Sequence, residues 1–194
     1  RSEAAAIFAR LLAEKNGDTI STAANTKFAD IPAHAWYSGY VKYLSNNGIT
    51  YGKSKTIFAP NDAITRAEFT TMAVRFFDVY GDGDAEIMEQ FSGFNDVSSG
   101  YWAAEYIKYA ALHGWINGYG DGSFHAEREI NRAEVVTIVN RLLGREADED
   151  YIADNLRKLN TFPDVSRKHW AYYAVMEAAN AHTAVLGESE SWSK

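Results

Sequence analysis

The sequence contains no cysteine, no excess of basic residues and no long apolar run. The absence of cysteine excludes disulfides, thiolate metal sites and thiol nucleophiles. The apolar runs are short and interrupted by charge, so none is long enough to cross a bilayer, and we expect no membrane insertion. The formal net charge of -7, without clustered Lys and Arg, argues against nucleic acid as a partner.

The chain is rich in apolar and aromatic residues. It is 194 residues long with 46% hydrophobic residues, which is enough to build a core. It has five Trp and twelve Tyr, and such side chains suit both protein cores and sugar-binding surfaces. We therefore expect a folded protein stabilised by packing. Composition alone leaves the role of the aromatic residues open.

One short motif occurs three times along the chain. A Phe-x-Asp segment precedes a Trp at constant spacing, and apolar side chains then follow at helical i, i+3, i+4 and i+7 spacing. This pattern predicts an amphipathic helix after each Trp. The three copies run from Phe28 through Asp30 to Trp36, from Phe94 through Asp96 to Trp102, and from Phe162 through Asp164 to Trp170.

A second predicted helix also recurs three times. Two copies open with Thr65-Arg66-Ala67-Glu68 and Asn131-Arg132-Ala133-Glu134, and another opens with Arg1-Ser2-Glu3. An N-cap Thr or Asn followed three residues later by Glu is a capping box, in which both side chains bond free backbone N–H groups. We therefore assign Glu68 and Glu134 to capping.

A glycine-containing stretch follows the Trp-containing helix in the first two copies. It runs from Gly48 to Pro60 and from Gly114 to Ala126, and the second stretch contains Asp121-Gly122, which predicts a tight turn or a minimal hairpin. This stretch has no counterpart after Trp170. We expect little sheet and a mainly α fold, with short loops or minimal hairpins between the helices.

The order of elements divides the chain into three pairs, each a capping-box helix followed by a Trp-containing helix. The pairs cover 1–48, 65–114 and 131–182, and a divergent tail follows at 183–194. Acidic connectors lie between the pairs, and the second predicts an extra helix from the helical spacing of Ile152, Leu156 and Leu159. Because the chain begins and ends within a repeat, we expect it to be continuous with a longer secreted chain.

Together these segments resemble the S-layer homology motif over almost the whole chain. The middle copy is nearly complete, with Trp102-Ala103, the loop from Gly114 to Phe124 and Asn131-Arg132-Ala133-Glu134. The resemblance implies a single unit over 1–194, in which three motifs form a pseudo-threefold helical bundle with grooves between its lobes. It also implies that the grooves bind a secondary cell wall polymer, often carrying a pyruvate ketal, and so anchor a secreted protein at the bacterial cell surface.

The recurring arginines are the first candidate binding residues. Arg66 and Arg132 directly follow a helix N-cap, where free backbone N–H groups and the helix dipole favour an anion. Arg1 matches them by register. A guanidinium can bind a sugar carboxylate through two hydrogen bonds. The alternative is a surface ion pair with nearby carboxylates, which contributes little energy; the resemblance favours binding.

The recurring Trp and Asp residues and two loop glycines complete the candidate site. Each Trp can stack on a sugar ring or anchor its helix in the core, and both roles remain open. Each Asp can accept sugar hydroxyls or cap a turn, and we favour the structural role. The glycines allow close backbone approach to a ligand or simply make the turn. The set is Trp36, Trp102, Trp170, Asp30, Asp96, Asp164, Gly118 and Gly120.

No metal, cofactor or catalytic residue is predicted. Asp78, Asp82, Asp84 and Glu86 are spaced somewhat like a calcium loop, but Tyr80 occupies a position that needs a ligand oxygen. The five His residues lack zinc-type spacing. The sequence also has no nucleophile elbow or phosphate-binding loop.

Three functions are consistent with the repeats. The leading hypothesis is a non-catalytic polysaccharide anchor, with the strongest binding at Arg66, Trp102 and the loop leading to Arg132. A glycoside hydrolase would need two carboxylates facing each other across a cleft, whereas the recurring Asp and Glu have capping explanations. A self-assembly module, in which half-repeats exchange between chains, is the third hypothesis.

Overall fold

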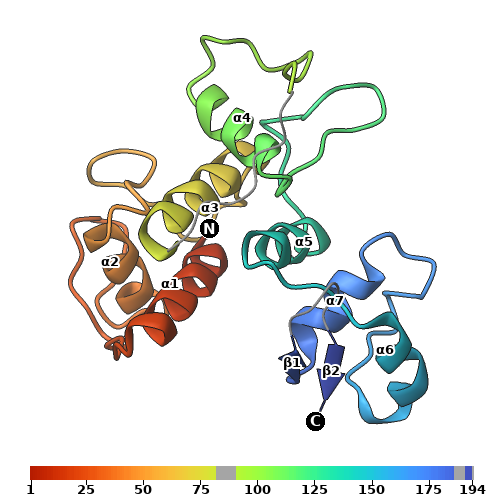
Figure 1. The fold of residues 1–194 in the computed structure, drawn as a ribbon. Helices are drawn as coiled ribbons and strands as arrows, with labels where there is room; N and C mark the ends of the chain where they lie inside the picture. The colour runs from red at the N-terminus through yellow and green to blue at the C-terminus, as the bar shows by residue number, and fades with distance from the viewer. Residues whose placement is uncertain (82–90, 186–190, 194) are drawn as a thin grey trace. The chain divides into compact units, whose positions relative to one another are not determined.

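The computed structural model describes residues 1–81, 91–185 and 191–193. As predicted, the described chain is mainly helical (Figure 1). Asp82, Asp84 and Glu86 of the calcium-like loop lie outside the described residues. No helix within the described ranges combines the length and apolarity needed to span a bilayer. The elements are α1 (Ser2–Asn16), α2 (Ser38–Asn46), α3 (Arg66–Tyr80), α4 (Ala104–Leu112), α5 (Arg132–Leu142), α6 (Glu149–Asn155), the 3₁₀ helix η1 (Leu156–Lys158), α7 (Tyr172–Ala179), β1 (Thr183–Val185) and β2 (Ser191–Ser193).

The chain folds as two compact units, Arg1–Ile130 and Asn131–Lys194. In the first unit α1 packs against α2 and α3, and α3 packs against α4 (Figure 1). In the second unit α5 packs against α7. The boundary falls directly before the third capping-box helix. Each capping-box helix therefore contacts the Trp-containing helix that follows it in the same predicted pair.

The core of the first unit is aromatic. Phe8 on α1 is fully buried, and its ring lies 5.2 Å from that of Phe69 and 5.0 Å from that of Phe76, both on α3. Alanines beside Phe8 on α1 are also buried, and small side chains allow helices to approach closely. The buried apolar faces of α1 and α3 are thus the surfaces that join these two helices.

The two predicted capping boxes are confirmed. The Thr65 hydroxyl accepts a hydrogen bond from the Glu68 N–H at 3.2 Å, and the Glu68 carboxylate accepts one from the Thr65 N–H at 3.1 Å. Asn131 and Glu134 make the same reciprocal pair at the start of α5, at 3.0 Å in each direction. These bonds fix where α3 and α5 begin, and so fix the positions of Arg66 and Arg132.

The second unit is completed by the connector and the tail. The extra helix predicted in the connector is present as α6, and Ile152 on it packs with Tyr172, Met176 and Trp192 in a separate apolar cluster. Strands β1 and β2 pair antiparallel, with Thr183 opposite Ser193. Asp148 accepts the backbone N–H groups of Tyr151 and Trp192, so one carboxylate caps α6 and holds β2. The Asp121-Gly122 segment forms the predicted turn, not a strand pair.

The Phe of the repeated Phe-x-Asp motif provides a stability test. Phe28 is 2% exposed and its ring lies 5.5 Å from that of Phe58, whereas the equivalent Phe162 is 43% exposed. We expect Phe28→Ala to lower the free energy of unfolding by about 3–5 kcal/mol, because it leaves a cavity. Phe162→Ala is the matched control and should cost less than about 1 kcal/mol. Urea titration of each variant measures both values, and equal losses would contradict the burial difference.

Candidate functional site

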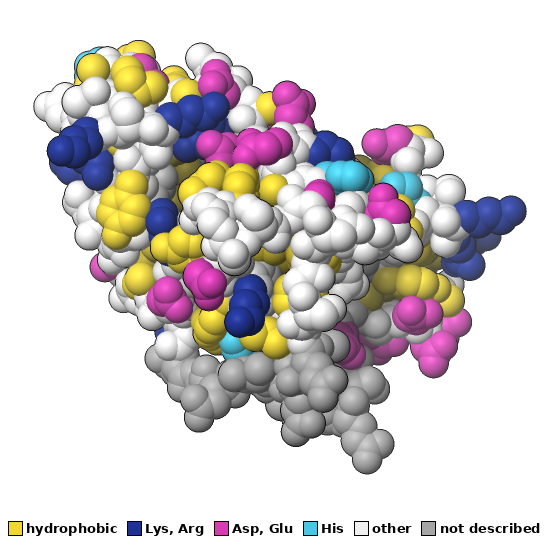
Figure 2. All heavy atoms as spheres, turned by 90° about the horizontal axis from the view of Figure 1, so that it is seen from above, with side chains coloured by type: hydrophobic (Ala, Val, Ile, Leu, Met, Phe, Trp, Pro, Cys, Tyr) yellow, Lys and Arg dark blue, Asp and Glu magenta, His cyan; other side chains and the backbone are white. Residues whose placement is uncertain are grey.

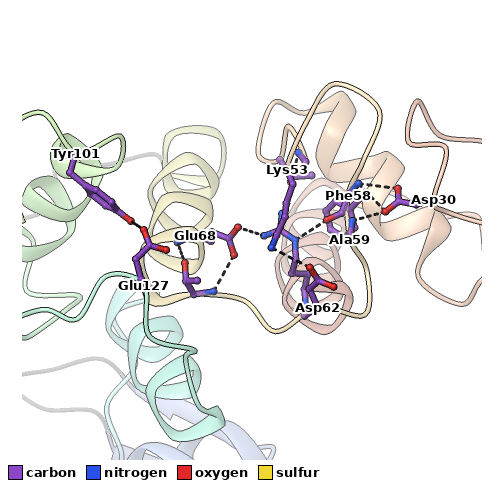
Figure 3. Close-up of polar contacts among 12 residues, drawn as sticks. Asp30, Lys53, Phe58, Ala59, Asp62, Glu68, Tyr101 and Glu127 are labelled. Carbon is purple, nitrogen blue, oxygen red and sulfur yellow. Dashed lines mark hydrogen bonds and ion pairs between the residues drawn. The ribbon is translucent and has the colours of Figure 1, made fainter.

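The first unit contains two loops of the same construction. We name them loop 1 (48–60) and loop 2 (114–126). The Asp30 carboxylate accepts the N–H groups of Phe58 at 2.9 Å and Ala59 at 2.6 Å in loop 1 (Figure 3). In loop 2, Asp96 accepts the N–H groups of Phe124 and His125, each at 2.7 Å. In the first two copies the Asp therefore holds the end of the loop, through bonds to residues 28 and 29 positions later in the chain.

These bonds stabilise an uncommon backbone conformation. Ala59 and His125 have φ values of 58° and 54°, in the left-handed region that side-chain-bearing residues seldom adopt. Burial alone would raise the pKa of Asp30 and of Asp96, but the backbone N–H groups outweigh it and lower both values. Both carboxyls are therefore held ionised, as acceptors.

Two of the three recurring arginines are buried beneath these loops. Arg66 is only 5% exposed, and its Nε donates to the Phe124 carbonyl at 2.8 Å while a terminal nitrogen donates to the Asn117 carbonyl at 3.1 Å. Its guanidinium carbon lies 4.4 Å from the centre of the Phe124 ring. Arg1 makes the equivalent Nε bond to the Phe58 carbonyl of loop 1, also at 2.8 Å. These arginines hold the loops through hydrogen bonds to loop carbonyl groups.

Arg1 also links the two capping-box helices of the first unit. Its guanidinium lies 2.6 Å from Glu68 Oε1, while Glu68 Oε2 accepts the Thr65 N–H of the capping box (Figure 3). One carboxylate thus completes the start of α3 and pairs with the residue at the start of α1. The sequence predicted the capping role of Glu68 but not this second contact.

Arg132 differs from its two equivalents because it is exposed. Arg1 and Arg66 bond the carbonyl of a Phe in the loop that follows their own helix pair. The glycine-containing sequence of these loops is not repeated after Trp170. The three arginines are equivalent by register, yet only Arg132 presents its side chain at the surface.

All three recurring Trp side chains are exposed. Trp36, Trp102 and Trp170 expose 54%, 55% and 64% of their surface. Tyr37 packs edge-on against Trp36 with ring centres 5.4 Å apart, and Tyr101 lies 5.7 Å from Trp102. The sequence leaves open whether each Trp stacks on a sugar ring or is buried in the core as an anchor for its helix. These exposed fractions are not those of buried anchors. Each stands at the surface just before α2, α4 or α7.

The remaining candidates have different surroundings. A Cβ atom on Gly118 would lie 2.4 Å from the Phe94 ring and 2.7 Å from the Ser123 carbonyl oxygen, so close packing requires glycine there. A Cβ on Gly120 would meet nothing within 4 Å. Asp164, like Asp96, is exposed, whereas Asp30 is half-buried. Gly118 thus serves loop packing, whereas Gly120 leaves open space above loop 2.

A hollow of about 510 Å³ lies at the end of loop 2. Tyr101 donates to Glu127 there, and burial together with this hydrogen bond raises the pKa of Tyr101. Arg128 donates to the Tyr119 hydroxyl. Apart from Asp96, the residues around this hollow are not predictable from the repeat pattern, because these side chains differ between the copies. The lining residues are Asp96, Tyr101, His125, Ala126, Glu127 and Arg128.

The described surface carries mixed charge. On the face drawn in Figure 2, Lys and Arg side chains are interspersed with Asp and Glu and form no broad basic area. Among the described residues, no group of three or more His, Asp or Glu side chains is placed to hold a metal ion. Any attraction for an anion on this face is therefore local, from single basic side chains.

The contrast between Arg66 and Arg132 can be tested by truncation. Arg66→Ala removes bonds to two loop carbonyls and contact with the Phe124 ring, so it should lower the free energy of unfolding by about 2–4 kcal/mol. Arg132→Ala, at an exposed position, should change it by less than about 0.5 kcal/mol. Thermal unfolding followed by circular dichroism compares the two variants. A stable Arg66→Ala protein would show that loop 2 does not depend on the guanidinium.

The Asp96 clamp predicts a dependence of stability on pH. Its folded-state pKa is lowered, so its contribution is present above the ordinary Asp pKa of about 3.9 and is lost as pH falls through the lower folded value. Asp96→Asn should cost about 1–3 kcal/mol at neutral pH and flatten the acid side of the stability profile. The exposed Asp164→Asn is the control and should change neither. Urea titrations between about pH 2 and 6 measure both effects.

Comparison with known proteins shows which protein family these repeats resemble. Residues 27–70 and 93–136 match the S-layer homology domain. Cell surface glycoprotein 1 of Acetivibrio thermocellus is 32% identical over 98% of this chain and 8% of that protein. The cellulosome-anchoring protein of the same organism is 30% identical over 97% of this chain and 40% of that protein. The surface-layer 125 kDa protein of Lysinibacillus sphaericus is 32% identical over 74% of this chain and 12% of that protein.

The chain thus spans less than half the length of these relatives. The two matched segments contain the two loops, the two loop-holding Asp residues, Trp36, Trp102 and the starts of α3 and α5. The third copy predicted from Phe162 to Trp170 lies outside the matched segments and stays a prediction. The chain therefore contains an S-layer homology domain, with two repeats at residues 27–70 and 93–136.

Proposed function

We propose that this chain holds a larger secreted protein at a bacterial cell surface by binding a wall polysaccharide, without catalysing a reaction. The two S-layer homology repeats and the likeness to cell-surface and anchoring proteins support this function and location. The observation that carries the binding role is the exposure of Trp36, Trp102 and Trp170 at one register of the repeat.

The exposed Trp side chains are suited to sugar rings. An exposed indole gains free energy when an apolar surface covers it, and the C–H faces of a sugar ring provide such a surface. The indole N–H is then available to a sugar hydroxyl. Three such residues at equivalent positions would bind a repeating polymer at several points, which raises the overall affinity above that of one contact.

The hollow beside Trp102 offers a place for a sugar substituent. It is an open depression of about 510 Å³, and Tyr101, on its border, neighbours Trp102. It has carboxylate, phenol and guanidinium groups within reach of a ligand. We assign it to the second repeat of the proposed polymer-binding surface.

The proposed polymer is anionic, with pyruvate ketal groups. Arg132 supports this because its exposed guanidinium lies at the start of α5, where the helix dipole also favours negative charge. A guanidinium binds a carboxylate through paired hydrogen bonds. Arg1 and Arg66 contribute through the loops that they hold.

A wall-degrading enzyme is less well supported. Glycoside hydrolysis needs two carboxyl groups about 5–9.5 Å apart across the scissile bond. Around the hollow, Asp96 accepts two backbone N–H groups and Glu127 accepts the Tyr101 hydroxyl. Glu68 both caps α3 and pairs with Arg1. Each of these carboxylates has a structural partner that fixes it.

Co-sedimentation with purified cell wall tests the anchor. The triple variant Trp36→Ala, Trp102→Ala, Trp170→Ala should lose most of its wall binding, because it removes three aromatic stacking surfaces that contribute about 1 kcal/mol each. Val79→Ala, at another exposed apolar position, is the matched control and should sediment like the parent. Circular dichroism verifies that each variant is folded. Undiminished sedimentation of the triple variant would exclude the Trp residues as the binding surface.

Chemical removal of the pyruvyl groups tests the proposal that the polymer binds through its pyruvate ketals. Wall polymer stripped of these groups should bind the parent chain more weakly, since the carboxylate for Arg132 is gone. Arg132→Ala should bind intact and stripped polymer equally. Equal binding of both polymers by the parent chain would remove the pyruvyl group from the proposal and leave the anchor role in place.

A further inference from the structure

The two loops place different side chains at the same backbone position. Ala59 in loop 1 and His125 in loop 2 both adopt the left-handed backbone conformation. Each donates its N–H to the Asp of its repeat. Three residues further along, Asp62 follows loop 1 and Arg128 follows loop 2. Only the second repeat therefore has an imidazole beside its loop-holding carboxylate.

The hydrogen bonds around His125 identify the state of its ring. The Ser123 hydroxyl lies 2.6 Å from Asp121 Oδ1 and must donate to it, since bonds from the Ser123 hydroxyl and N–H lower the pKa of Asp121 and keep it ionised. The same hydroxyl lies 3.0 Å from His125 Nε2 and therefore accepts from it. In the neutral ring the proton is thus on Nε2, and the lone pair is on Nδ1.

The lone pair of Nδ1 faces a carboxylate. Nδ1 lies 3.6 Å from Asp96 Oδ2, the oxygen that also accepts the His125 N–H. Protonation of the ring adds its proton at this nitrogen and turns two acceptors facing each other into an ion pair. Imidazoles gain this proton between about pH 8 and 5, a range in which carboxylates stay ionised.

One proton changes the charge balance of the hollow. The groups that face the ring are Asp96, Asp121 and the Tyr119 ring, whose centre lies 4.8 Å from that of His125. The remaining ionisable groups that line the hollow are Tyr101, Glu127 and Arg128. With a neutral ring, two carboxylates in the lining are opposed by one guanidinium. With a protonated ring, the charges of the lining cancel.

We propose that His125 makes the second repeat a pH-dependent site for an anionic sugar substituent, which binds more tightly in mildly acidic conditions than at neutral pH. This inference rests on the proposed polysaccharide-binding function. The lining repels the substituent while it carries excess negative charge, and protonation of His125 removes that excess. The first repeat lacks this response, because Ala59 stands at the equivalent position.

Binding of purified anionic wall polymer to the whole chain, by calorimetry at about pH 5 and about pH 7.5, tests the proposal. The parent chain should bind about threefold more tightly at the lower pH, the size of one solvent-exposed charge interaction. His125→Ala installs the residue of the first repeat at the same backbone conformation and should lose this increase. His125→Lys carries a charge at both pH values and should bind tightly at both.

The comparison of variants isolates His125 from the other histidines, which are present in all of them. A pH response of equal size in the parent and in His125→Ala would overturn the inference and leave the anchor function standing. A response that persists with polymer whose carboxylates have been reduced would overturn it too, because the substituent would not be the anion. Failure of the parent chain to bind polymer at either pH would remove the proposed function together with this inference.

Discussion

The paired hydrogen bonds from a loop backbone to one aspartate are the interaction on which the first unit depends. Asp30 and Asp96 each accept two consecutive N–H groups at a residue held in the left-handed conformation. This backbone conformation fixes the direction of the preceding Phe carbonyl. That carbonyl accepts a hydrogen bond from the arginine at the start of α1 or α3. Aspartate, loop and arginine form one polar assembly in each repeat, so none can be altered alone.

This assembly also explains where the Trp residues lie. The Phe of the Phe-x-Asp motif is turned inward against the Phe at the end of the loop, as Phe28 is against Phe58 and Phe94 against Phe124. The chain then continues to the following helix with its Trp outside. In the third copy, where the glycine-containing sequence of the two loops is not repeated, Phe162 and Arg132 are both exposed. The third copy therefore differs from the first two at both ends of the motif.

Much of this arrangement follows from the sequence, for local reasons. Capping boxes at Thr65 and Asn131 depend on residues three positions apart, and the helical stripes depend on residues within two turns, so both were predictable. The burial of Arg66 was not, because it depends on a carbonyl 58 residues later in the chain. The hollow was missed for the opposite reason: His125 and Arg128 are where the repeats differ, and comparison of repeats selects what is shared.

The double role of Glu68 makes the stability of neighbouring repeats interdependent. One of its oxygens completes the N-terminal cap of α3, and the other pairs with Arg1 at the start of α1. Loss of the guanidinium would leave the cap carrying an unopposed negative charge, and loss of the cap would release the arginine that supports loop 1. Such nearest-neighbour coupling gives repeat arrays cooperative unfolding. The first two helix pairs should therefore unfold in one cooperative transition, although each is followed by its own loop.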